Sequence, residues 1–111
     1  MKIALSFLTF LLLCASAPGT SQAAADPTAD IARLQQRWAE VNYQLEGKTQ
    51  LTAFEQLIQD ADAITTANPD SAGAYIWSGI VKSSYAGAKG GLGAMKLAKA
   101  SRADLERAME L

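Results

Sequence analysis

The segment "ANPDSAGAYIWSGIVKSSYA", residues 67–86, decides the fold because it ends one helix and begins another. Asn68 and Pro69 are expected to stop the helix that ends in this segment, since proline lacks the backbone N–H that would continue it. Asp70 or Ser71 can then cap the next helix. A connection this short makes the helices on either side of it antiparallel neighbours. The segment therefore predicts a fold of packed helical hairpins.

Two helices are predicted before this segment. Asp26 and Pro27 supply a cap and a first-turn proline for the first helix, and Gly47 is expected to end it. The second helix is expected to begin at a capping box of Thr52 and Glu55. Apolar residues recur at helical steps in both, at Ile31, Leu34, Trp38, Val41 and Leu45, and at Phe54, Leu57, Ile58, Ala61 and Ile64.

Two more helices are predicted in the second half of the chain. The third is expected to run to about Tyr85, with an apolar stripe of Ile76, Trp77, Ile80 and Val81. The fourth is expected from about Leu92 to the end, with Ala94, Leu97, Ala98, Ser101, Leu105, Ala108 and Leu111 on one face. A later start at "SRAD" competes, but the stripe passes through it unbroken. The expected fold class is thus all-α, with two antiparallel helical hairpins and about four helices.

The first 25 residues have the layout of a secretory signal peptide. One lysine precedes an apolar run, residues 3–17, and small residues follow it. The run is shorter than the roughly 20 residues that a membrane-spanning helix requires. Small side chains in "SQA" and "AAA" predict cleavage after Ala23 or Ala25, which leaves residues 26–111 as one domain.

Cysteine and histidine usage narrows both the compartment and the chemistry. Cys14 is the only cysteine, and the chain has no histidine. Acylation of Cys14 in a lipoprotein would require a small residue before it, and Leu13 stands there, so we favour simple cleavage. Disulfides, Cys/His zinc sites and histidine bases are excluded from residues 26–111. We expect a protein exported to a bacterial periplasm.

The charge balance gives no sign of nucleic-acid binding. Without Lys2, nine basic residues face eleven acidic ones, a net charge of −2. A domain of this size buries only about 60% of its unfolded surface and is marginally stable alone. We therefore expect a protein partner or self-association to contribute to its stability.

The glycine-rich stretch "YAGAKGGLGAMKLAK", residues 85–99, superficially resembles a phosphate-binding loop. Its order is wrong for one, because Lys89 precedes the glycine pair and no serine or threonine follows it. We interpret the glycines as the turn between the third and fourth helices. Asp60 and Asp62 are expected on a solvated face, and Ser83 and Ser84 lack a local base. No catalytic, cofactor-binding or metal-binding residue is expected, and the chain is not expected to be an enzyme.

The opening segment also resembles the junction between two tetratricopeptide (TPR) repeats. One repeat would end at Pro69, and the next would open with Ala72, Ala74, Tyr75 and Gly79. "LERAMEL" at the end resembles the close of a TPR second helix, preceded by small Ser101. The resemblance implies an α-α superhelix in which Gly79 lets the two helices of a hairpin approach closely.

The chain departs from the TPR pattern in both residues and length. Ser78 stands where the family has leucine, Lys82 where it has an aromatic residue, and Ile64 where it has alanine. Gly79 and Ala108 are 29 residues apart instead of the usual 19, so about ten extra residues lie inside the hairpin. As an exported TPR-like chain, it is loosely similar to the T component of TRAP transporters.

The resemblance implies a protein-interaction role without catalysis. First helices of TPR repeats line the surface that grips peptides, which makes Trp77, Lys82 and Tyr85 the expected partner-binding residues. An array normally needs three or more repeats, so we expect self-association, or a chain that is the N-terminal part of a longer array. Two alternatives remain: an accessory solute-binding component that takes a small apolar ligand, and a truncated relic.

Overall fold

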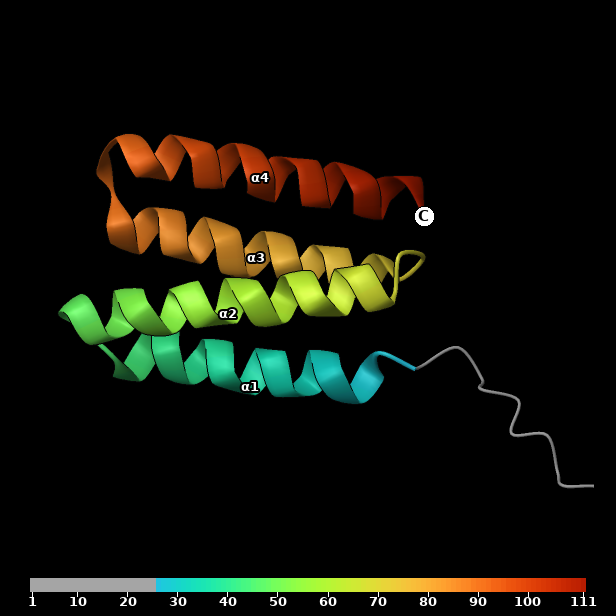
Figure 1. Ribbon diagram of the computed structural model, residues 1–111, viewed down its shortest axis with the longest axis horizontal. Coiled ribbons are helices and arrows are strands. Elements are labelled where there is room, and N and C mark those ends of the chain that lie inside the picture. Colours follow the sequence, from blue (N-terminus) through green and yellow to red (C-terminus); the bar gives the residue numbers. More distant parts are fainter. Residues whose placement is uncertain (1–25) are drawn as a thin grey trace, which may run out of the picture.

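The computed structural model describes residues 26–111, which fold into four α-helices and contain no strand (Figure 1). The helices are α1 (Thr28–Gln44), α2 (Gly47–Ala67), α3 (Ala72–Lys89) and α4 (Gly91–Glu110). The expected all-α fold of about four helices is confirmed. The predicted signal peptide, with its cleavage sites and Cys14, lies outside the described residues.

The four helices form two antiparallel hairpins that are joined through α3. Helix α3 packs against α1, α2 and α4, whereas α4 packs against α3 alone. Figure 1 shows α4 on the outside of the arrangement, with α3 between it and the first hairpin. Because α4 has one neighbour and not three, a large part of its circumference faces solvent.

The core lies where α3 meets the first hairpin. Phe54 and Leu57 of α2 and Val41 of α1 are almost fully buried, and Val81 of α3 packs among them. The complete buried cluster comprises Leu34, Val41, Ala53, Phe54, Leu57, Ala61, Val81 and Tyr85. All of this cluster comes from α1, α2 and α3, so the first three helices hold one another together and α4 is added to their edge.

The turn between α1 and α2 differs from the prediction. Helix α1 ends at Gln44, and Gly47, with a φ of 60°, begins α2 and does not end α1. Thr52 and Glu55 therefore lie inside α2, and the predicted capping box is wrong. The capping-box pattern is local, while apolar burial extends α2 toward its N-terminus, where Leu51 packs against the core.

The connection between α2 and α3 follows the prediction closely. Asn68 stops α2, and both its backbone and its side-chain amide donate to the Ile64 carbonyl oxygen, at 3.0 and 2.9 Å. Ser71 is the N-cap of α3, and its hydroxyl accepts a hydrogen bond of 3.2 Å from the Ala74 N–H. Of the two predicted caps, the structure thus selects Ser71.

The glycine pair forms the bend between α3 and α4. Gly90 and Gly91 have φ angles of 65° and 68°, in the left-handed region that favours glycine. Helix α3 runs to Lys89, four residues beyond the expected end, and α4 is one continuous helix as predicted. The long-helix interpretation was right because "SRAD" lies inside a helix that remains packed on α3.

The stripes predicted for α3 and α4 are partly displaced. Ile76 is 41% exposed, while Ser78 and Lys82 are buried in its place. On α4, Ser101 is buried, but Leu105 and Leu111 remain 39% and 45% exposed. The reason is that α3 meets other helices on three sides and α4 on only one. None of the four described helices is long and apolar enough to cross a membrane.

Candidate functional site

Trp77 lies in an aromatic contact that joins α1 to α3. Its ring meets the edge of Trp38 at a centroid distance of 5.7 Å, and Trp38 makes a similar contact with Tyr43. The Trp38 indole N–H donates to the Ser84 hydroxyl at 2.8 Å, and this hydroxyl donates to the Ile80 carbonyl oxygen. Trp77 is partly buried, so its ring belongs mainly to the contact between the two helices.

Tyr85 points into the core and not toward solvent. Its ring stacks on Phe54 at 5.8 Å, and its hydroxyl donates to a Glu55 carboxylate oxygen at 2.9 Å. Burial raises the pKa of the Tyr85 hydroxyl, and the hydrogen bond to Glu55 adds to the effect. The Lys89 Nζ lies 5.5 Å from the ring centroid. Tyr85 therefore fixes α3 against α2.

Lys82 is buried between two carboxylates from different helices. Its Nζ lies 2.8 Å from Asp62 of α2 and 2.7 Å from Asp104 of α4. The Ser78 hydroxyl donates to the same Asp104 oxygen at 2.6 Å. We call these four residues the lysine cluster. It links α2 to α4, which otherwise do not pack against each other.

The electrostatics of the lysine cluster keep Lys82 charged. Burial by itself would lower the pKa of Lys82, but the hydrogen bonds and charges of Asp104 and Asp62 outweigh it, and the pKa is raised. A lysine that acts as a base or a Schiff-base nucleophile needs a lowered pKa. In this arrangement Lys82 serves as a hydrogen-bond donor in an ion pair between helices.

The three residues predicted to bind a partner are thus brought onto one helix but not onto one surface. Tyr85 is 5% and Lys82 9% exposed, and each already has partners within the chain. Asp62 is 55% exposed, on the solvated face that was expected, and it also pairs with Lys82. One signal could have indicated the burial of Lys82, though not its partners: the TPR resemblance implies an aromatic residue at this position, and such a position is normally buried.

The glycine-rich stretch has no phosphate-binding geometry. The Lys89 side chain extends toward Gly93 of α4: a Cβ added to Gly93 would lie 2.9 Å from the Lys89 Cε. Gly90 and Gly91 have open space around their Cα atoms. The stretch forms the bend between α3 and α4, as the spacing predicts. Among residues 26–111, no group of three or more potential metal ligands comes together.

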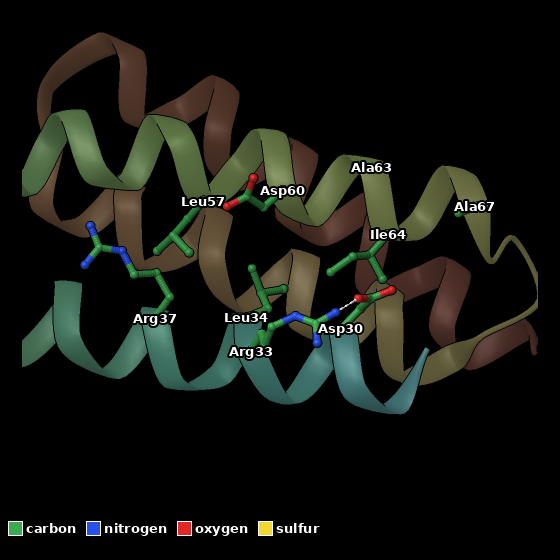
Figure 2. Close-up of a pocket in the computed structure, with 9 residues that line it drawn as sticks. All are labelled: Asp30, Arg33, Leu34, Arg37, Leu57, Asp60, Ala63, Ile64 and Ala67. Atoms are coloured by element: carbon green, nitrogen blue, oxygen red, sulfur yellow. Dashed lines mark hydrogen bonds and ion pairs between the residues drawn. The ribbon is translucent and has the colours of Figure 1, made fainter. Parts of the chain in front are cut away.

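A groove of about 440 Å³ runs between α1 and α2 (Figure 2). Leu34, Leu57 and Ile64 supply apolar surface, while Arg33 and Arg37 of α1 line its edge. Figure 2 shows Arg33 paired with Asp30 of the same helix and Asp60 entering from α2. Both arginines have acidic partners on α1, since Arg37 lies 2.8 Å from Glu40. The groove is an amphipathic site whose charges are already balanced.

A second surface, formed by α3 and α4, is mainly apolar, with the charged Arg102 in its middle, and is largely uncovered. The apolar residues of this surface recur along α4 at steps of 3, 7 and 4, at Met95, Ala98, Leu105 and Met109. Arg102 divides the step of 7 into helical steps of 4 and 3. Three of them are clearly exposed for apolar residues: Met95 at 62%, Leu105 at 39% and Met109 at 80%. This stripe lies next to the buried stripe of α4, one residue further along the chain.

Helix α3 extends this surface with Ile76 and Ile80. Leu105 lies over Gly79, so closely that a Cβ there would be 2.8 Å from its Cγ. On α3, Ile76 lies one turn before Gly79, on the side away from Lys82 and Asp104. We call the surface formed by Ile76, Ile80, Met95, Ala98, Arg102, Leu105 and Met109 the open face.

The open face was missed by the sequence analysis, although its pattern is present in the sequence. A helix with a single apolar stripe needs one neighbour, whereas α4 carries two adjacent stripes. Only one of them is covered by α3. Comparison with protein families, with curated proteins and with solved structures found no match to this chain.

Proposed function

We propose that this chain is an exported, TPR-like module that binds another protein and catalyses no reaction. The observation that carries the proposal is the open face. Helix α4 packs against α3 alone and leaves Met95, Leu105 and Met109 exposed beside Ile76. Contiguous apolar surface of this kind is typical of interaction sites in small proteins.

Two features of the hairpin support the TPR-like part of the proposal. Gly79 packs under Leu105, and the Ser101 hydroxyl donates to the Gly79 carbonyl oxygen at 2.7 Å. This is the close helix approach that the resemblance implies for a glycine followed by small and large residues on the next helix. In addition, α3 packs against both helices of the preceding hairpin, as stacked repeats do.

The proposal moves the binding surface away from the residues first expected to form it. Trp77, Lys82 and Tyr85 stabilise contacts inside the chain. The exposed apolar residues of α4 have no such contacts on their outer side. Binding through the open face would bury methionine and leucine side chains, whose transfer from water is worth about 25 cal/mol per Å².

Site-specific photo-crosslinking tests this function. A photoreactive amino acid replaces Met109 on the open face, and in the matched control it replaces Lys96, an exposed residue on another side of α4. We expect adducts of discrete mass from position 109 and only background from position 96. Equal labelling from both positions would overturn the proposal. Cell fractionation and N-terminal sequencing, with Ala24 or Asp26 expected first, test export.

The groove between α1 and α2 favours one second candidate function. Its apolar floor suits a small apolar acid, whose carboxylate would replace Asp30 or Glu40 as the partner of Arg33 or Arg37, as expected for a solute-binding component similar to the T component of TRAP transporters. Thermal-shift screening with such acids should then raise the melting temperature. Arg37→Ala should abolish the shift, while Arg102→Ala, outside the groove, should leave it unchanged. No shift with any acid would remove this candidate.

A further inference from the structure

We propose that the tip of the α3–α4 hairpin binds the surface of an anionic phospholipid membrane, with Leu92 inserted among the lipid headgroups. We call Lys89, Leu92, Lys96 and Lys99 the basic tip. The inference goes beyond the proposed function, because it gives a partner to a second surface of the chain.

Basic residues gather at this tip without acidic neighbours in the sequence. Between Asp70 and Asp104 the chain contains no aspartate and no glutamate. Lys82 is neutralised inside the lysine cluster, and Arg102 pairs with Glu106. The three lysines of the basic tip are exposed, and none of them forms an ion pair within residues 26–111. The tip therefore presents three positive charges that no ion pair neutralises.

One exposed face of α4 runs from the basic tip to an acidic C-terminal end. Leu92, Lys96 and Lys99 follow one another at steps of 4 and 3, so they share one side of the helix. Steps of 7 and 4 then place Glu106 and Glu110 on the same side, and all five residues are exposed. An anionic surface attracts the first half of this face and repels the second. Helix α4 therefore has to approach such a surface tip first, in a tilted orientation.

Leu92 gives the tip an apolar contact. It is 94% exposed in the first turn of α4, and Met95, one turn further along, is 62% exposed. A Cβ added to Gly90 or Gly91 would meet no atom within 4 Å, so the bend projects into open space at the end of the hairpin (Figure 1). A projecting leucine can pass between headgroups while the lysines beside it reach the lipid phosphates.

A fluid membrane suits this tip better than an acidic protein does. Three grooves of the chain are lined by residues between Asp26 and Ser71, away from the tip. A protein partner would have to provide a pocket for Leu92 and fixed carboxylates around it, whereas lipid headgroups rearrange around a convex tip. At the same end of the molecule, Glu46 and Lys48 of the α1–α2 turn carry opposite charges and leave the balance unchanged (Figure 1).

The tilted orientation is compatible with binding through the open face. Leu105 and Met109 lie toward the acidic end of α4, where repulsion lifts the helix from an anionic surface. These two residues remain available to a protein partner while the tip is bound.

Vesicle flotation of the full chain, in the form that cells produce, tests the inference. Vesicles of phosphatidylglycerol and phosphatidylcholine should bind the chain at low salt, and vesicles of phosphatidylcholine alone should not. Lys96→Gln combined with Lys99→Gln should weaken binding about twentyfold, because each lysine near an anionic surface contributes about fivefold. Gln36→Glu combined with Gln59→Glu lowers the net charge by the same amount at exposed positions of α1 and α2, and should leave binding nearly unchanged.

Leu92→Gln tests the insertion. It should weaken binding about tenfold without changing the salt dependence, and its exposure makes unfolding unexpected. No binding to the mixed vesicles, equal losses from the two charge variants, or unchanged binding of Leu92→Gln overturns the inference. Binding to polyglutamate but not to vesicles also overturns it and assigns the tip to an acidic protein. The crosslinking test of the open face stays separate, because a lipid adduct from position 96 is far smaller than a protein adduct from position 109.

Discussion

Replacing Gly79 by alanine should destabilise the protein, although alanine is the better helix former. A Cβ at this position would lie 2.8 Å from the Leu105 Cγ, 2.9 Å from its Cδ2 and 3.3 Å from the Ser101 carbonyl oxygen. The first two contacts are shorter than real Cβ atoms make, and the third involves backbone that cannot rotate away. Helices α3 and α4 would have to move apart.

The expected loss combines two destabilising contributions and one that opposes them. Overpacking costs about 1–3 kcal/mol, and separation of the helices weakens the 2.7 Å hydrogen bond from Ser101 to the Gly79 carbonyl oxygen, worth about 1 kcal/mol. Alanine returns about 1 kcal/mol through helix propensity. Gly79→Ala should therefore lower the free energy of unfolding by about 1–3 kcal/mol and the melting temperature by about 5–20 °C.

The same helix provides a matched control. Gly87 also lies within α3, and a Cβ there would have no atom within 4 Å. Gly87→Ala should accordingly stabilise the chain by about 0.5–1 kcal/mol. Urea unfolding followed by far-UV circular dichroism measures both variants. If Gly79→Ala stabilises as much as Gly87→Ala does, the close approach of α3 and α4 is not a constraint and the packing argument fails.

Three further predictions concern the caps and the lysine cluster. Ser71→Ala should lower the free energy of unfolding by about 1 kcal/mol because Ser71 caps α3, whereas Thr52→Ala, inside α2, should not lower it. Equal losses of the two variants in urea unfolding would contradict the assigned helix starts. Lys82→Met should lower the free energy of unfolding by about 2 kcal/mol, since it leaves Asp104 16% exposed without its cation, and an unchanged urea midpoint would count against the cluster. The pKa values of Lys82 and Tyr85 are both raised in the folded state. The stability that these two groups contribute is therefore present below about pH 10 and is lost as the pH rises through their folded pKa values. Tyr85→Phe should flatten this alkaline decline in a pH series of unfolding curves, and an identical decline in the variant would show that Tyr85 plays no part.

The helix ends show what the sequence could and could not predict. The stop at Asn68 and Pro69 and a cap at Asp70 or Ser71 rest on local chemistry; the structure confirms the stop and selects Ser71 as the cap. The start of α2 depends on packing, because α2 begins at Gly47, where no side-chain cap is formed. The capping pattern at Thr52 is present in the sequence but does not start the helix. A cap or a favourable helix propensity is worth only about 1 kcal/mol, so where a local signal and tertiary burial favour different helix ends, burial decides.

The lysine cluster shows the same limit at the level of side chains. Periodicity places Lys82 on a helix, but only the positions of α2 and α4 reveal that Asp62 and Asp104 converge on it. These two carboxylates lie 20 residues before and 22 residues after it. No pattern along the chain connects residues at such distances. Sequence reasoning could detect a lysine at an apolar position, but its partners required the fold.

The number of neighbours of each helix explains why the binding surface also escaped prediction. Reading one apolar stripe per helix assumes that each helix has one buried side, which suits α1 and α2. Helix α3 has three neighbours, so polar Ser78 and Lys82 are buried while Ile76 remains exposed. Helix α4 has one neighbour but two adjacent stripes. The second stripe is a mainly apolar surface that the described residues leave largely uncovered, and it is the surface on which the proposed function depends.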